Sequence, residues 1–169
     1  AGGAFAYVRN PDERTHLMQV DLASGKTSRV TESAALDTDP AYSPDGKRIA
    51  FASTRSGTPS IYLANADGSN VAMLASLPDR GLLGSPRWSP DGKQLAFDGF
   101  PESKRRILVV NVENGKLQTL PIEGTLPSWS RDGQFLYFCK AGKADNVWRV
   151  PVAGGHEVQI TRNGGRESV

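Results

Sequence analysis

The sequence is poor in the residues that most often carry out chemistry or cross-link a chain. Its 169 residues include one cysteine and two histidines, so no disulfide can form within the chain and no zinc-type Cys and His spacing exists. No Gly-x-Ser-x-Gly motif occurs, which excludes the nucleophile turn of an α/β-hydrolase. We therefore expect a non-enzymatic chain with no catalytic residue and no bound cofactor.

Blocks of charge and long apolar runs are also missing. Twenty basic and 18 acidic residues give a net charge of +2 and are interspersed, which predicts no attraction to nucleic acid. The densest basic cluster, residues 104–106, lies between two apolar segments and is expected to be a solvated loop. The longest apolar runs are only a few residues long, so we expect no signal peptide and no membrane insertion in this segment.

Glycine and proline are abundant, with 18 and 11 residues, beside 38% hydrophobic residues. This combination favours many short strands joined by tight turns over long helices. The length is sufficient for one domain with a sizeable core. The composition therefore predicts an all-β fold.

One motif occurs three times along the chain. Each copy reads as a short strand ending in an aromatic residue, a turn containing Ser, Asp and Gly, and a second strand of alternating apolar residues. The copies lie at residues 39–51, 85–97 and 126–138. Their Asp-Gly pairs are spaced by 46 and 41 residues, which is typical of a four-stranded propeller blade. Proline presets φ and glycine supplies positive φ in such turns, so the motif is explained without a ligand.

Turns and apolar segments after each motif complete four strands per repeat. We predict a β-propeller of four-stranded antiparallel blades, with four blade equivalents in this chain. The expected blades are residues 1–32 (strands two to four only), 33–76, 77–121 and 122–161, followed by a first strand at 162–169. That last segment can close a ring, within one chain or in an eight-bladed homodimer. The interpretation we favour is a longer propeller cut between turns.

The repeat resembles the TolB-type β-propeller repeat. The resemblance is carried by residues 36–51, 53–57, 61–62 and 67–70 and extends over nearly the whole chain. Similar repeats occur in TolB, in tricorn-type and prolyl-oligopeptidase propellers, and in extracytoplasmic sensor parts of some bacterial regulators. The third repeat departs from the pattern because it lacks the Ser-x-Arg-x-Gly segment, and Arg131 replaces proline in the fourth turn.

The resemblance implies a bacterial protein, periplasmic or extracytoplasmic in location, and leaves three functions open. The first, which we favour, is a protein-binding sensor or scaffold segment of a larger protein. The second is the gating propeller of a prolyl-oligopeptidase-like or tricorn-like peptidase whose catalytic domain is absent here. The third is a propeller that binds a small molecule or carbohydrate, or acts as a lyase, through its channel.

Loops that lead into the inner strands are the expected binding regions, because rigid scaffolds carry specificity on their loops. Arg80, Leu82 and Leu83 combine a charge with apolar side chains that we expect to be exposed, and are the first candidates for contact with a protein. Asp37 and Asp39 precede an inner strand and are expected to face the mouth of the channel. Their carboxylates suit Ca²⁺, but we favour hydrogen bonds between blades or an ion pair with Arg55.

Aromatic residues recur at two positions of the repeat, and we expect both sets to pack between blades, each ring contributing about 2–3 kcal/mol. The two sets are Tyr42, Trp88 and Trp129, and Phe51, Phe97 and Phe138. Cys139 belongs to an alternating apolar segment and is expected to be a buried thiol. No catalytic role is expected for His16 or His156.

Overall fold

The computed structural model describes residues 4–9, 15–78, 81–101, 104–141 and 145–165 of the chain, without the side chains of Phe5 and Arg9. In this part the regular structure consists of fifteen strands in four separate antiparallel sheets. This described part contains no helix that is long and apolar enough to cross a membrane. The all-β prediction is therefore confirmed.

The four sheets follow one another in chain order, and within each sheet the strands pair in the order in which they occur. Sheet 1 contains β1 (Ala4–Arg9), β2 (His16–Asp21) and β3 (Thr27–Arg29). Sheet 2 contains β4 (Asp37–Tyr42), β5 (Arg48–Ser53), β6 (Ser60–Asn65) and β7 (Ala72–Ala75). Sheet 3 contains β8 (Leu83–Trp88), β9 (Gln94–Gly99), β10 (Arg106–Asn111) and β11 (Leu117–Thr119). Sheet 4 contains β12 (Thr125–Trp129), β13 (Phe135–Lys140), β14 (Asn146–Pro151) and β15 (Val158–Gln159).

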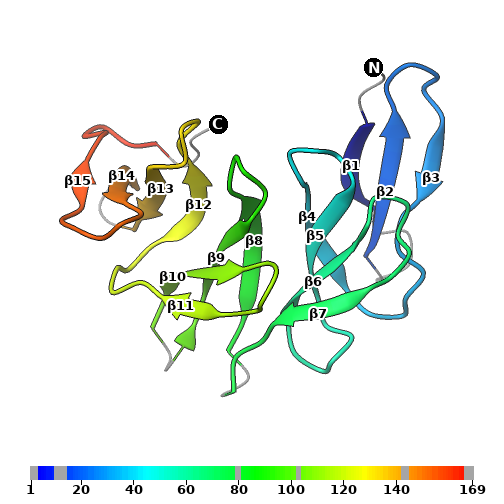
Figure 1. Ribbon diagram of the computed structural model, residues 1–169, viewed down its shortest axis with the longest axis horizontal. Coiled ribbons are helices and arrows are strands. Elements are labelled where there is room, and N and C mark those ends of the chain that lie inside the picture. The colour runs from blue at the N-terminus through cyan, green and yellow to red at the C-terminus, as the bar shows by residue number, and fades with distance from the viewer. Residues whose placement is uncertain (1–3, 10–14, 79–80, 102–103, 142–144, 166–169) are drawn as a thin grey trace.

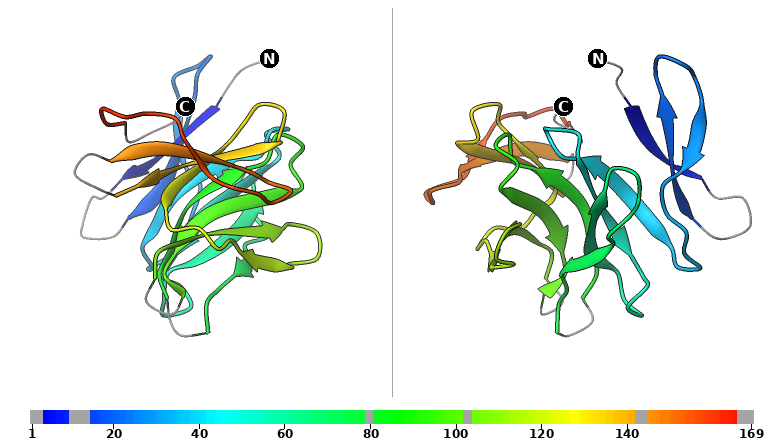
Figure 2. Two further views of the ribbon diagram at one scale, coloured as in Figure 1. Left: turned by 90° about the vertical axis from the view of Figure 1, so that its left-hand side faces the viewer. Right: turned by 45° about the vertical axis from the view of Figure 1, so that its right-hand side comes forward.

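The sheets stand side by side in a row, with sheet 1 at one end and sheet 4 at the other (Figures 1 and 2). The first strands β4, β8 and β12 of successive sheets are neighbours. This is the arrangement of propeller blades, with β4, β8 and β12 as the inner strands. The strand expected at 162–169 includes residues 166–169, which lie outside the described residues, and the blade boundaries stay a prediction.

The repeated turn joins the first two strands of sheets 2, 3 and 4 by the same hydrogen bonds. The hydroxyls of Ser43, Ser89 and Ser130 donate to the aspartate two residues later at 2.6 Å and accept the backbone N–H five residues later. The serine hydroxyl first, and then a backbone N–H, hold the pKa of Asp45, Asp91 and Asp132 below the ordinary value. The turn of sheet 4 keeps these bonds although it has Arg131 in place of proline. The serine and the aspartate therefore determine the geometry of the turn.

The core lies in the three seams between neighbouring sheets. Phe51, Phe97 and Phe138 are completely or almost completely buried, one in each seam. Tyr42, Trp88 and Trp129 pack in the same seams, and their polar atoms reach the preceding sheet. Trp88 Nε1 donates to the Ala41 carbonyl at 2.9 Å, Trp129 Nε1 to the Arg87 carbonyl at 3.0 Å, and the Tyr42 hydroxyl to Gln19 Oε1 at 2.7 Å. The expected packing of both aromatic sets between blades is confirmed.

The remaining residues singled out in the sequence take ordinary positions. Cys139 is buried on β13, as expected, with its sulfur 3.8 Å from the Gly165 carbonyl oxygen. His16 is buried at the start of β2 and His156 is exposed between β14 and β15. The two histidines therefore occupy different sheets at opposite ends of the row.

Candidate functional site

Each inner strand bends at the same position of the repeat. Asp39, Ser85 and Leu126 have φ values of 53°, 53° and 51°, each precedes a proline, and the pairing with the second strand shifts register there. Left-handed backbone is uncommon for residues other than glycine, and β-bulges re-aim side chains next to functional sites. The bulge recurs at the same position of each inner strand, and we therefore take the surroundings of this position as the candidate site.

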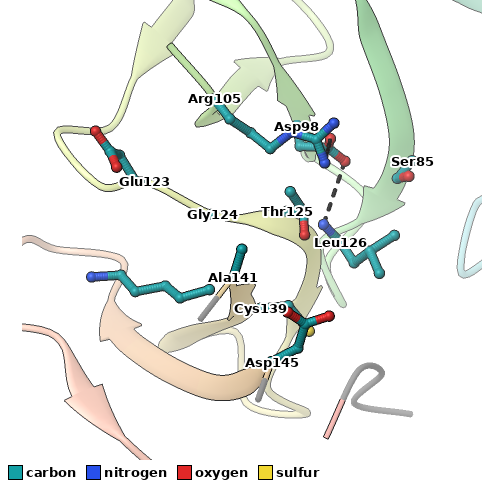
Figure 3. Close-up of a pocket in the computed structure, with 11 residues that line it drawn as sticks. Ser85, Asp98, Arg105, Glu123, Gly124, Thr125, Leu126, Cys139, Ala141 and Asp145 are labelled. Atoms are coloured by element: carbon teal, nitrogen blue, oxygen red, sulfur yellow. Dashed lines mark hydrogen bonds and ion pairs between the residues drawn. The ribbon is translucent and has the colours of Figure 1, made fainter. Parts of the chain in front are cut away.

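A cleft of about 710 Å³ opens at this level between sheets 3 and 4 (Figure 3). Its walls come from β8, β9 and the loop after β9 on one side, and from β12 and β13 with their adjoining loops on the other. It is lined by Ser85, Asp98, Arg105, Glu123, Gly124, Thr125, Leu126, Cys139, Lys140, Ala141 and Asp145. The cleft thus combines carboxylates, cations and hydroxyls at the inner ends of two blades.

Asp98 is the carboxylate of the cleft that contacts one of the bulges. It stands on β9, its side chain is 13% exposed, and the backbone N–H of Leu126 donates to Oδ1 at 3.4 Å (Figure 3). Burial raises the pKa of Asp98 above the ordinary value, and the carboxylate of Asp39 acts in the same direction. The Leu126 N–H, the Arg105 guanidinium and the Ser85 hydroxyl oppose the rise in pKa without cancelling it. The charged form of Asp98 is therefore incompletely compensated in the cleft.

The cations of the cleft are held by aromatic rings. The Arg105 guanidinium lies 4.4 Å from the centre of the Phe100 ring and 4.0 Å from Asp98 Oδ2, with its side chain 48% exposed. Lys140 pairs with Glu157 and lies 4.7 Å from the centre of the Trp148 ring. Arg105 is half-exposed although Asp98 is largely buried, so the guanidinium is accessible to a group of a bound partner.

Replacing Asp98 by asparagine is expected to raise the midpoint of thermal unfolding at pH 7. The raised pKa means that ionised Asp98 destabilises the folded state above its folded pKa, and that this penalty is lost as the pH falls through that pKa towards the ordinary value of 3.8. The gain from D98N should therefore shrink as the pH falls through the folded pKa of Asp98 and be absent below about pH 3.8. A lower midpoint for D98N at pH 7 would show that the contacts with Leu126 and Arg105 outweigh burial.

The acidic pair expected at the channel mouth is divided between two roles. Asp37 is completely buried, and both its oxygens lie 3.1 Å from Arg55 Nη2. Asp39 is exposed, and its Oδ2 accepts a hydrogen bond from the Thr38 hydroxyl at 3.1 Å. In the part of the chain that the structure describes, no group of three His, Cys, Asp or Glu residues is arranged to hold a metal ion. Ca²⁺ in the channel stays a prediction from the sequence.

The apolar candidates also separate. Leu82 is 55% exposed, as expected, but the expectation that Leu83 is exposed is wrong, because Leu83 is 3% exposed. Leu83 begins β8 opposite Gly99, and a β-carbon on Gly99 would lie 2.4 Å from its Cδ2, so the missing side chain leaves the space that Leu83 fills. Arg80 lies outside the described residues.

Leu82 forms the rim of a second, smaller hollow together with Leu36, which is 45% exposed. This groove between sheets 2 and 3 has a volume of about 260 Å³. It is lined by Leu36, Thr38, Ala52, Ser53, Thr54, Pro59, Leu82 and Leu83. We call it the apolar groove, and it shares the inner strand β8 with the cleft.

Sequence reasoning missed Asp98 and treated Arg105 as an ordinary surface residue. A usable signal was present, because the repeat position of Asp98 holds Ala52 in the second repeat and Cys139 in the fourth. A carboxylate at a position that is otherwise small and buried indicates a local polar environment. The pairing of Asp98 with a loop cation depends on the course of the loop and could not be read from the repeat.

Comparisons with known proteins agree with this architecture. The model of the TolB β-propeller domain matches residues 1–79. An uncharacterized protein of Agrobacterium fabrum is 30% identical over 149 residues, covering 80% of this chain and 51% of the relative. The Tol-Pal system protein TolB of Bordetella pertussis is 48% identical over 42 residues, which are 25% of this chain and 10% of that protein. The chain thus spans about half the length of the Agrobacterium relative.

Solved structures extend the likeness to the whole row of sheets. A structure assigned to TolB from Agrobacterium tumefaciens matches with a TM-score of 0.79 and 25% identity, covering 88% of this chain and 55% of that one. An oligogalacturonate lyase in complex with manganese matches at 0.70 and 19% identity, covering 88% and 42%, and at that identity the match shows the fold alone. The family model over residues 1–79, the relatives and the repeated four-stranded sheets together identify the fold of this chain as a TolB-like β-propeller.

Proposed function

We propose that the chain is a non-enzymatic scaffold that binds a protein partner at the inner ends of sheets 2, 3 and 4. The observation that carries the proposal is the exposed pair Leu36 and Leu82 on the rim of the apolar groove, beside the polar cleft around Asp98. Protein interfaces combine apolar anchors with a polar rim in this way. The partner would place an apolar side chain in the groove and polar groups in the cleft.

The mixed charge of the cleft supports a peptide-like partner. The negative charge of Asp98 is incompletely compensated, and the guanidinium of Arg105 is half-exposed. A partner could therefore donate a hydrogen bond to Asp98 and accept one from Arg105. The strands beneath these residues are anchored by the buried seams, which keeps the surface preorganised. The resemblance of one segment to a Tol-Pal system protein agrees with a protein partner.

The test is the effect of one surface substitution on partner binding. A partner recovered by crosslinking from a bacterial extract would be purified, and its affinity measured for the L82D variant and for L22D as the matched control. Leu22 is 65% exposed and lies in the turn after β2 of sheet 1, away from the proposed surface. We expect L82D to weaken binding by about tenfold or more, the effect of losing an apolar anchor, and L22D to leave it unchanged. Equal affinities for L82D and the unchanged protein would contradict the proposed surface.

Two copies of the chain are further proposed to associate into an eight-bladed ring. The support is that each end sheet has an apolar face with no neighbouring sheet in the described part of the chain. On β2, Met18 and Val20 alternate with Leu17, which faces sheet 2. On β13, Tyr137 alternates with Leu136 and Phe138, which face sheet 3. Light scattering at micromolar concentration is expected to give twice the monomer mass, and a monomer mass would contradict the ring.

A further inference from the structure

The chain contains two Asn-Gly pairs, Asn114-Gly115 and Asn163-Gly164. Asparagine loses its side-chain amide most readily when glycine follows, because glycine has no side chain to shield its backbone nitrogen or to restrict its backbone. The side chains of both asparagines are exposed. Exposure therefore does not distinguish the two pairs, and their reactivity depends on the hydrogen bonds that hold each of them.

Asn114 is held in the turn between β10 and β11. Its Oδ1 accepts the backbone N–H of Lys116 at 2.9 Å, and its own N–H donates to Asn111 Oδ1 at 3.0 Å. The nitrogen that would attack its side chain, Gly115 N, donates to the Asn111 carbonyl at 2.9 Å. The strands on both sides of the turn are paired with each other. A reaction at Asn114 therefore requires the turn to open.

The second pair lies in the segment 161–165, which follows β15 and is drawn in red in Figure 1. Within the described ranges of the chain, the Asn163 side chain forms no hydrogen bond. Gly164 N donates to a side-chain atom, Asn146 Oδ1, at 3.3 Å. Gly164 and Gly165 have φ values of +96° and +157°, which glycine adopts without strain. The Asn163 side chain can therefore approach Gly164 N without the opening of a turn.

The equivalent connection between sheets 1 and 2 shows that this position is at the surface when another sheet follows. Thr31 and Thr161 occupy the same position of the repeat, because each hydroxyl accepts the N–H of the second residue of the neighbouring strand, β2 or β14. Ser33 is thus the counterpart of Asn163. Ser33 is half-buried, and the residues on either side of it are exposed although sheet 2 follows.

We propose that Asn163 is a site of spontaneous deamidation in the folded protein, with Gly164 N as the nucleophile and water as the co-reactant. The nitrogen gives up its proton to water and bonds to Cγ of Asn163, the Cγ–Nδ2 bond breaks, and ammonia leaves with a proton. Water then adds to either carbonyl carbon of the resulting imide ring. Opening at Cγ gives aspartate, and opening at the main-chain carbonyl carbon gives isoaspartate, in which the chain runs through Cγ.

Both products change the surface beside the cleft. Each has a carboxylate where the unmodified chain has a neutral amide, and isoaspartate adds a methylene to the main chain directly before Gly164. The next residue, Gly165, has its carbonyl oxygen 3.8 Å from the sulfur of Cys139, which lines the cleft. The reaction needs no partner protein, so it is independent of the proposed function.

The direct test compares the two asparagines in one sample. The purified chain is incubated at mildly alkaline pH, folded or in urea, and the asparagine, aspartate and isoaspartate forms of each peptide are quantified by liquid chromatography and mass spectrometry. In the folded chain we expect Asn163 to react about tenfold or more faster than Asn114, because the turn around Asn114 must first open. In urea the two rates should become similar. Equal rates in the folded chain, or the same ratio in urea, would overturn the proposal.

A matched pair of variants identifies the site independently. N163Q and N114Q each replace one exposed asparagine by glutamine, whose longer side chain would have to close a larger ring. Isoaspartate in the whole protein is measured by enzymatic methylation after the same incubation. N163Q is expected to remove most of the isoaspartate that the unchanged folded chain forms, and N114Q to leave most of it. The reverse result, or equal isoaspartate in the two variants, would overturn the proposal.

Discussion

Replacing Arg55 by alanine is expected to lower the free energy of unfolding by about 3–5 kcal/mol, the range for breaking one side of a buried ion pair. Arg55 is the cation that faces the completely buried carboxylate of Asp37, and its guanidinium also lies 5.1 Å and 5.0 Å from the ring centres of Phe51 and Tyr62. Without Arg55 the carboxylate stays buried with its charge uncompensated. The measurement is chemical denaturation at pH 7.

Two controls separate the buried charge from a general effect of losing arginine. R29A removes an exposed ion pair in which Arg29 lies 3.6 Å from Glu32, and is expected to change stability by less than about 1 kcal/mol. The double variant D37L/R55M removes both charges, and should recover much of the loss because the third repeat has Leu83 at the position of Asp37. A loss in R55A no larger than that in R29A would contradict the role of the pair.

Replacing Gly68 by alanine is expected to destabilise the protein by roughly 2–5 kcal/mol, through left-handed strain and overpacking. Gly68 has φ +86° in the turn between β6 and β7, and an added β-carbon would overlap the carbonyl oxygen of Val30 in sheet 1. The β-carbon is fixed to the backbone of the turn and the atom it overlaps is a backbone oxygen, so neither can move alone and the turn must separate from Val30. Thermal unfolding measures the loss, and amide exchange should show that sheet 1 loses protection first.

G115A is the matched control for G68A. Gly115 also has positive φ, +68°, in a turn of sheet 3, but an added β-carbon there meets nothing within 4 Å. Its substitution should show the backbone strain alone, about 1–2 kcal/mol. If G68A and G115A were equally stable, the contact between Gly68 and Val30 would contribute nothing to the seam between sheets 1 and 2.

The sheets could be predicted from the sequence because each repeat contains the residue types that form its turn. Ser43, Asp45 and Gly46 each contribute a specific hydrogen bond or φ value to the hairpin, and the same types recur at the same spacing in sheets 3 and 4. The aromatic residues followed from the same logic, since a bulky side chain at one repeat position implies a repeated seam. The residue types of the turns and the period of the repeat were therefore enough to predict the fold.

The candidate site was less accessible from sequence, because its features depend on pairs of residues that are distant in the chain. The exposure of Leu83 could not be judged without knowing that Gly99 lies opposite it on β9. Asp37 and Asp39 are two residues apart, yet one is fully buried and the other exposed, because of the bulge between Thr38 and Ala41. A bulge reverses the simple alternation of faces, and alternation was the rule available.

The hydrogen bonds from the indole nitrogens to the preceding inner strand have a spectroscopic consequence. Trp88 reports on the seam between sheets 2 and 3, and Trp129 on the seam between sheets 3 and 4. Separation of two sheets would release the corresponding indole to water and shift its emission to longer wavelength. With single-tryptophan variants, the order in which the seams open could be followed by intrinsic fluorescence, without any attached dye.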